Sequence, residues 1–260
     1  MVGNDAVGRV DFLGFQIAGV SGQYAQRQGS AQNQANPIDV QREELQKLLL
    51  SGIKGDSCIS KHTNIKEVIR NMVSMLGHGL TASASDDATD KFQPVLDHVT
   101  HSNTPQFVFH EMTHAWAHLN TDLPPPPFFG YDKKIDRMHE GLGWAASTLM
   151  TALESFSGIE INVDGMTCDE FAKKAKHRVR LGMKNMESFK GQLNDDNNTA
   201  FTGGVDDFKR LSKMLGFRFD CKGFIQCVNS RKPGCECQTQ GTHDALNDGD
   251  CPDWILDTYP

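Results

Sequence analysis

Two histidines and a glutamate share one pentapeptide, His110-Glu111-Met112-Thr113-His114. The histidines are four residues apart, which places both imidazoles on the same face of a helix. Two such rings can bind one tetrahedral zinc ion at metal–nitrogen distances of about 2.0–2.1 Å. This HExxH spacing therefore predicts a zinc site in which His110 and His114 are metal ligands.

The acidic residue of the pentapeptide, Glu111, projects about 100° around the helix from His110. That direction suits a carboxylate that contacts a zinc-bound water and not the ion. Zinc lowers the pKa of its water from about 15.7 towards about 7, so Glu111 could take the proton as general base and pass it to a leaving amine. We therefore predict a zinc-dependent metalloendopeptidase that acts on protein or peptide substrates. Two core histidines beside a solvated glutamate are the other interpretation, but these side chains serve packing poorly.

A catalytic zinc needs a third protein ligand and one open position. The extended HExxHxxGxxH form is excluded, because residue 117 is alanine and residue 120 is asparagine. The carboxylates that follow His114 leave four candidates for the third ligand: Asp122, Asp132, Asp136 and Glu140.

The element that must position the histidines is a helix over residues 105–119. Val108, Met112 and Ala115 recur at helical spacing and form an apolar stripe with the neighbouring aromatic residues. Thr104 before Pro105 supplies a helix cap and a first-turn proline. The HExxH segment is therefore expected to be an amphipathic helix that packs into the core.

Apolar periodicity predicts that the rest of the chain is also mainly helical. We expect the fold class to be mainly α, or α+β with minor strands, with a zincin-like catalytic domain in which the HExxH helix forms the floor of a cleft. Gly77 and Gly79 are expected to end the second helix, and residues 159–163 alternate as a short strand would. The further helices are expected over residues 40–49, 65–76, 92–99, 144–156, 169–193 and 208–215.

Composition divides the 260 residues into three segments. Residues 1–36 are expected to form a strand and a flexible segment, residues 37–216 the helical metalloprotease domain, and residues 217–260 a cysteine-rich tail. The four consecutive prolines within residues 123–130 predict a loop.

The net charge of −7 makes nucleic acid an unexpected partner. No apolar segment approaches the roughly 20 residues of a membrane span, so no membrane partner is expected.

Five of the seven cysteines fall within the last 40 residues. Their CxxxxxC and CxC spacings differ from the paired CxxC steps of a zinc knuckle, which favours disulfides over a structural metal. Disulfides indicate an oxidising compartment. We therefore expect a secreted protein, although charged residues interrupt the first dozen positions where a signal peptide would need an apolar segment.

The pentapeptide, preceded by Phe107-Val108-Phe109 and followed by Ala115, resembles the deuterolysin-type zinc endopeptidases, also called aspzincins. In that family an aspartate after the second histidine is the third ligand, within a Gly-Thr-x-Asp-x-x-Tyr-Gly motif that leads into an alanine-rich helix. Residues 142–149, Leu-Gly-Trp-Ala-Ala-Ser-Thr-Leu, resemble the end of that motif and the helix after it. The resemblance covers residues 105–150.

The resemblance implies that Asp136 is the third ligand and that Tyr131 polarises the scissile carbonyl. The chain departs from the family, because no Gly-Thr-x-Asp lies about ten residues after His114 and Tyr131 precedes Asp136 in reversed order. Glu140, 26 residues past His114, is the next choice, since other proteases take their third ligand from a glutamate on a following helix. Two alternatives stay open: a secreted effector or interaction protein that keeps the zinc helix without protease activity, and a non-proteolytic hydrolase.

Overall fold

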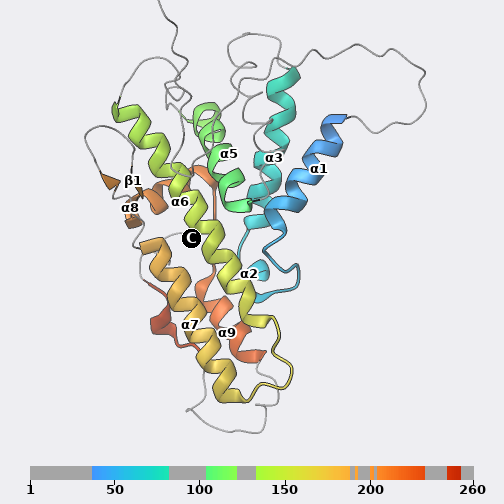
Figure 1. Cartoon of the computed structure of the whole chain (residues 1–260), viewed down its shortest axis with the longest axis vertical. Coiled ribbons are helices and arrows are strands. Elements are labelled where there is room, and N and C mark those ends of the chain that lie inside the picture. Colours follow the sequence, from blue (N-terminus) through green and yellow to red (C-terminus); the bar gives the residue numbers. More distant parts are fainter. Residues whose placement is uncertain are drawn as a thin grey trace, which may run out of the picture.

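Helices form most of the part of the chain that the structure describes (Figure 1). The structure is a computed structural model, and it describes residues 37–81, 104–121, 133–187, 191–192, 200–201, 204–231 and 245–252. The predicted mainly α class is confirmed. The elements are helices α1 (Pro37–Leu50), α2 (Cys58–Lys61), α3 (Ile65–Thr81), α5 (Pro105–Asn120), α6 (Lys133–Ser157), α7 (Cys168–Glu187), α8 (Gly204–Leu215) and α9 (Cys221–Ser230), short 3₁₀ turns η1 (Gly158–Glu160) and η2 (Asp248–Asp250), and strands β1 (Gly191–Gln192) and β2 (Ala200–Phe201).

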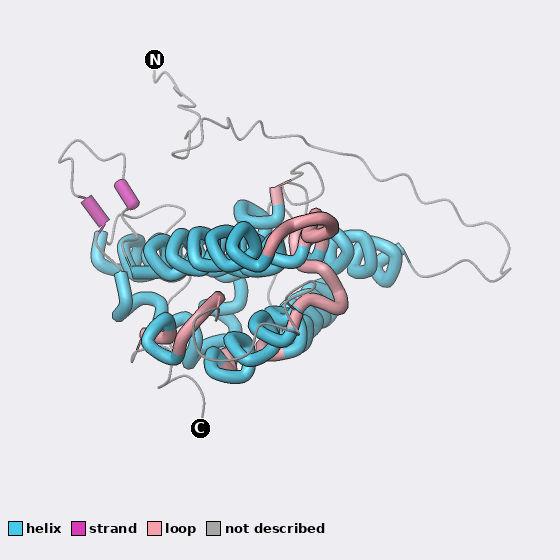
Figure 2. The backbone as a smooth tube through the Cα atoms, turned by 90° about the horizontal axis from the view of Figure 1, so that it is seen from below, coloured by secondary structure: helices cyan, strands magenta, loops and turns pink. Residues whose placement is uncertain are grey.

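The two strands pair antiparallel, with Gly191 opposite Phe201. Seen from below, the helices lie in two layers, and the strands lie at one edge (Figure 2). No helix within the described ranges is long and apolar enough to cross a membrane. The segment 1–36, the helix expected over residues 92–99 and the proline loop all lie outside the described residues.

The HExxH helix α5 begins where the sequence predicts. Thr104 occupies the N-cap position and Pro105 the first turn, and the carbonyl of Thr104 accepts hydrogen bonds from the backbone N–H groups of Phe107 and Val108. Proline costs nothing at this position, because its missing N–H would have no partner within the helix. The apolar stripe is buried, with Val108 at 0% and Met112 at 1% exposure. The prediction that this helix packs into the core is therefore confirmed, although residues off the stripe, such as Phe109 and Ala117, are buried as well.

Helix α6 is the central element of the fold. It packs most extensively against α5 and also contacts α7 and α8, and Figure 1 shows it running through the middle of the molecule. It begins at Lys133, eleven residues before the helix that periodicity predicts from Trp144. The extra turns carry Ile135, Met138 and Leu142 at spacings of three and four residues, a helical signal that the prediction did not use.

Three sequence predictions of local structure are wrong. The helix expected over residues 169–193 ends at Glu187, and residues 191–192 form strand β1, where Gly191 is a poor helix former and pairs with Phe201 of β2. Helix α3 continues through Gly77 and Gly79 to Thr81, because an isolated glycine weakens a helix by only about 1 kcal/mol and does not have to end it. Residues 159–163 do not form a strand. Ile159 is buried in the turn η1, whereas Ile161 is 43% exposed and Asn162 has a φ of 55°, so the alternating residues share no common face.

The structure contains disulfides, as the cysteine spacing favours, and they join elements that are distant in sequence. Cys58 of α2 is bonded to Cys227 of α9, and Cys221 to Cys251. Cys168 is disulfide-bonded as well. Helix α9, within the segment expected to be a cysteine-rich tail, contributes buried Phe224 and Val228 to the same apolar core as α5 and α6. In the described part of the chain, the core is therefore continuous across residue 217.

Candidate metal centre

The two histidines of the pentapeptide lie side by side on α5. Their ring centroids are 4.7 Å apart and their planes are nearly perpendicular, at 83°. Both are shielded from solvent, because the side chain of His110 is 8% exposed and that of His114 is 12% exposed. The four-residue spacing therefore brings the imidazoles together in the folded chain.

Helix α6 adds a carboxylate to this pair. Oε2 of Glu140 lies 3.7 Å from Nε2 of His110, and Oε1 lies 3.8 Å from Nε2 of His114. These distances are longer than ordinary hydrogen bonds. Two ligand atoms of one tetrahedral zinc lie about 3.4 Å apart, given metal–ligand bonds of about 2.0–2.2 Å. The ligand atoms of the three residues all lie within 4.8 Å of one another, so the group could hold a metal ion.

The structure does not describe the side chains of the other candidates for the third ligand or of Tyr131. Asp136 lies on α6, four residues before Glu140, but its side chain is outside the described residues. Tyr131, Asp122 and Asp132 lie outside them altogether. The roles that the sequence gives to Asp136 and Tyr131 therefore stay predictions, and the described part of the chain brings Glu140 to the histidines.

The predicted general base, Glu111, follows His110 directly on α5. Its side chain is half-buried. The side chain is therefore partly open to solvent. Its catalytic role also stays a prediction.

Burial keeps both imidazoles uncharged near neutral pH. Removal from water lowers the pKa of His110 to about 4, and a hydrogen bond to the backbone of Gly143 offsets this only in part. Burial also lowers the pKa of His114 well below 6.5, and the neighbouring rings of His110 and His139 lower it further. The neutral imidazole is the form that binds metal ions. The folded chain therefore holds both rings in the protonation state of a ligand.

Nδ1 of His114 is buried and has no hydrogen-bond partner among the described residues. A metal-binding histidine usually donates its second ring N–H to a partner, and a core histidine would also be expected to satisfy both ring nitrogens. This atom therefore does not distinguish a metal ligand from a core histidine.

One face of α6 surrounds the histidines with three residues that sequence reasoning did not assign to the site. A Cβ atom at Gly143 would lie 2.7 Å from Nε2 of His110, so only glycine allows this close approach. The Trp144 ring meets the His110 ring edge-on at 5.0 Å, and the buried His139 ring lies 5.8 Å from that of His114. Their spacing from Glu140, at one, three and four residues, is the helical signal that could have identified them.

Comparison of the chain with protein-family models, with curated proteins and with solved structures finds no match. The geometry of His110, His114 and Glu140 is therefore the basis for assigning a function.

Substitution of Gly143 by alanine should weaken metal binding. The new methyl group would lie within 3 Å of three atoms of the His110 ring, so the ring has to turn away from Glu140. We expect the affinity for Zn²⁺ to fall by about 10- to 100-fold, as it does when groups that orient a ligand are lost. Isothermal titration with Zn²⁺ measures the change. Thr148→Ala, further along α6, is the matched control, and equal affinities in the two variants would contradict the expectation.

Acid should destabilise the metal-free protein through these buried rings. The pKa of His110 is about 4 in the folded chain and returns to 6.5 on unfolding, so the unfolded state binds more protons between these pH values. The free energy of unfolding should therefore fall by about 3 kcal/mol from pH 6.5 to pH 4 through His110 alone. Urea unfolding of chelator-treated protein across this range measures the loss. His110→Asn should lose less stability than the wild type, and identical pH profiles would refute the assignment.

Proposed function

We propose that this chain is a zinc-dependent metalloendopeptidase. The observation that carries the proposal is the meeting of two buried, uncharged imidazoles from an HExxH helix with the carboxylate of Glu140 from the next described helix. Two nitrogen donors and one oxygen donor are a set that zinc accepts in hydrolytic enzymes, where three protein ligands leave one position for water or substrate.

When bound, zinc would supply a Lewis acid that activates water and polarises the scissile carbonyl. The chain's own residues provide the rest of the chemistry. Glu111 would accept a proton on its carboxylate oxygen and return it to the leaving amine. Because Glu111 is only half-buried, its carboxylate can exchange protons with a substrate that enters from the solvent side.

The residues of α6 would keep the ligands in place. Gly143 lets the His110 ring approach the helix, and Trp144 packs edge-on against that ring. The ring of Phe107 also lies beside that of His110, with centroids 6.4 Å apart, which helps to keep water away from it. Rings held by packing lose little freedom when a metal binds, so the site would be preorganised.

We propose Glu140 as the third ligand. The resemblance to deuterolysin-type endopeptidases implies Asp136, whereas the contacts of the described residues favour Glu140, whose two oxygens lie near the two histidines. A Glu140 ligand would limit the resemblance to the HExxH helix and the alanine-rich part of α6. It would make the chain a divergent relative of that family at most.

The disulfides support an extracellular site of action. Cys58–Cys227 and Cys221–Cys251 are bonds of the kind that persist in oxidising environments. A peptidase outside the cell would meet protein substrates there. We therefore propose that the protein is secreted.

Zinc binding distinguishes the two candidate third ligands. Glu140→Gln removes the anionic oxygen and should weaken Zn²⁺ binding by about 100-fold or more, whereas Asp136→Asn should leave it nearly unchanged. Metal content after dialysis and titration with a zinc indicator measure both. The opposite order of effects would assign the ligand to Asp136 and support the aspzincin resemblance.

Loss of the general base should separate catalysis from metal binding. Glu111→Gln should retain zinc and the folded structure, and should cleave an unfolded protein substrate about 10²- to 10⁴-fold more slowly. Glu154→Gln, at an exposed position of α6, is the matched control. Cleavage that survives the Glu111 change would remove the mechanism. Tight zinc binding without any chelator-sensitive cleavage by the wild type would instead support a zinc-binding interaction protein.

A further inference from the structure

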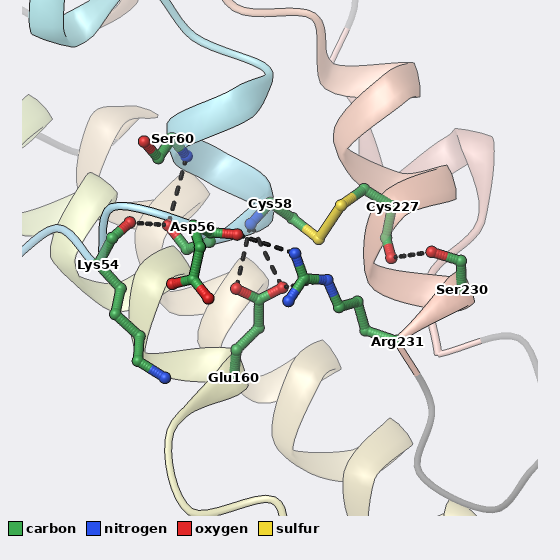
Figure 3. Close-up of polar contacts among 9 residues, drawn as sticks. Lys54, Asp56, Cys58, Ser60, Glu160, Cys227, Ser230 and Arg231 are labelled. Carbon is green, nitrogen blue, oxygen red and sulfur yellow. Dashed lines mark hydrogen bonds and ion pairs between the residues drawn. A yellow bond between two sulfur atoms is a disulfide. The ribbon is translucent and has the colours of Figure 1, made fainter.

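A second group of potential ligands lies at the other end of α6, around the disulfide between α2 and α9. Glu160 follows α6 in the turn η1 and points towards Cys58 and Cys227 (Figure 3). The two sulfur atoms and one carboxylate oxygen all lie within 4.8 Å of one another. Among the described residues, this is the group that combines two cysteines with a third potential ligand.

The carboxylate is held firmly in this position. Its oxygens accept hydrogen bonds from the backbone N–H of Cys58 at 3.1 and 3.3 Å, and Oε1 lies 3.4 Å from Nε of Arg231. The side chain of Glu160 is only 8% exposed. Arg231 is fixed in turn, because it donates to the backbone carbonyl of Asp56 at 2.8 Å (Figure 3). A carboxylate fixed beside two sulfur atoms is already placed as a ligand.

We propose that Cys58, Cys227 and Glu160 form a second divalent metal site when their disulfide is reduced. The ion would be of the thiolate-binding class, such as Zn²⁺, with water in the fourth position. It would keep α2 joined to α9 after the covalent bond between them has been reduced. This proposal does not depend on the peptidase function or on the histidine site.

The chemistry is balanced by an external reductant. A dithiol or phosphine supplies two electrons, the sulfur–sulfur bond breaks, and each sulfur takes up one proton. One divalent ion then displaces these two protons as two metal–thiolate bonds form, which links metal binding to folding.

Distance and charge both favour this exchange. Two sulfur atoms at about 2.3 Å from one tetrahedral ion lie about 3.8 Å apart, so the sulfurs need only a small separation while their Cα atoms start 5.6 Å apart. Two thiolates and one carboxylate bring three negative charges to a divalent ion. Arg231 beside Glu160 supplies the positive charge that balances the remaining one.

The test is protection of named cysteines in the full-length protein. The chain is reduced with a phosphine, which is then removed. It is then treated with iodoacetamide, either without Zn²⁺ or with one equivalent of Zn²⁺ more than the histidine site would bind. Peptide mass spectrometry reports the rate at each cysteine. We expect Zn²⁺ to slow alkylation of Cys58 and Cys227 at least tenfold and to leave Cys221 and Cys251 unchanged, since that pair has no third ligand among the described residues.

Variants identify the ligands and distinguish this site from the histidine site. Co²⁺ bound to reduced wild-type protein should show the intense near-ultraviolet band of a metal–thiolate bond, and Cys58→Ser with Cys227→Ser should abolish it. Glu160→Gln should weaken the protection, whereas His114→Gln should leave it intact. Equal protection of all four cysteines, no protection, or a reduced chain that is unfolded and that Zn²⁺ does not restore would each overturn the proposal.

Discussion

The close contact between α5 and α6 at Gly143 is the constraint on which the candidate site depends. Without a side chain at this position, α6 can approach until its backbone touches the His110 ring. That approach brings Glu140, less than one turn earlier, to both histidines. A larger residue would clash with the His110 ring and turn it away from the carboxylate. The glycine at this position therefore allows the three candidate ligands from two helices to meet.

Burial of the two histidines disfavours their charged forms, and this leaves them in the form that can bind a metal ion. Taking His110 and His114 out of water lowers the pKa of both rings, so folding cannot gain from their charged forms. The same desolvation leaves neutral rings whose lone pairs are available to a cation. The attraction between a bound divalent ion and the Glu140 carboxylate would be stronger here than in water, because the surrounding apolar residues screen charge weakly.

Helix α6 organises two separate groups of ligands. Glu140 lies in its first half, and Glu160 lies twenty residues later in the turn η1 that follows its end, so roughly 30 Å separate them. The first group contains nitrogen and oxygen donors, and the second contains sulfur and oxygen donors. The two therefore differ in the metals they favour and in their dependence on redox conditions, although α6 and the turn that follows it supply a carboxylate to each.

The sequence by itself determined the features that depend on the spacing of residues within one segment of the chain. The four-residue step from His110 to His114, the Thr104-Pro105 start of α5 and the mainly helical class all follow from periods of a few residues along one chain segment. The identity of the third candidate ligand does not follow from such periods. Asp136 and Glu140 are one helical turn apart, so both lie on the same face of a helix and spacing alone cannot distinguish them. Only the tertiary structure brought Glu140 to the histidines, because that meeting depends on how closely two helices pack.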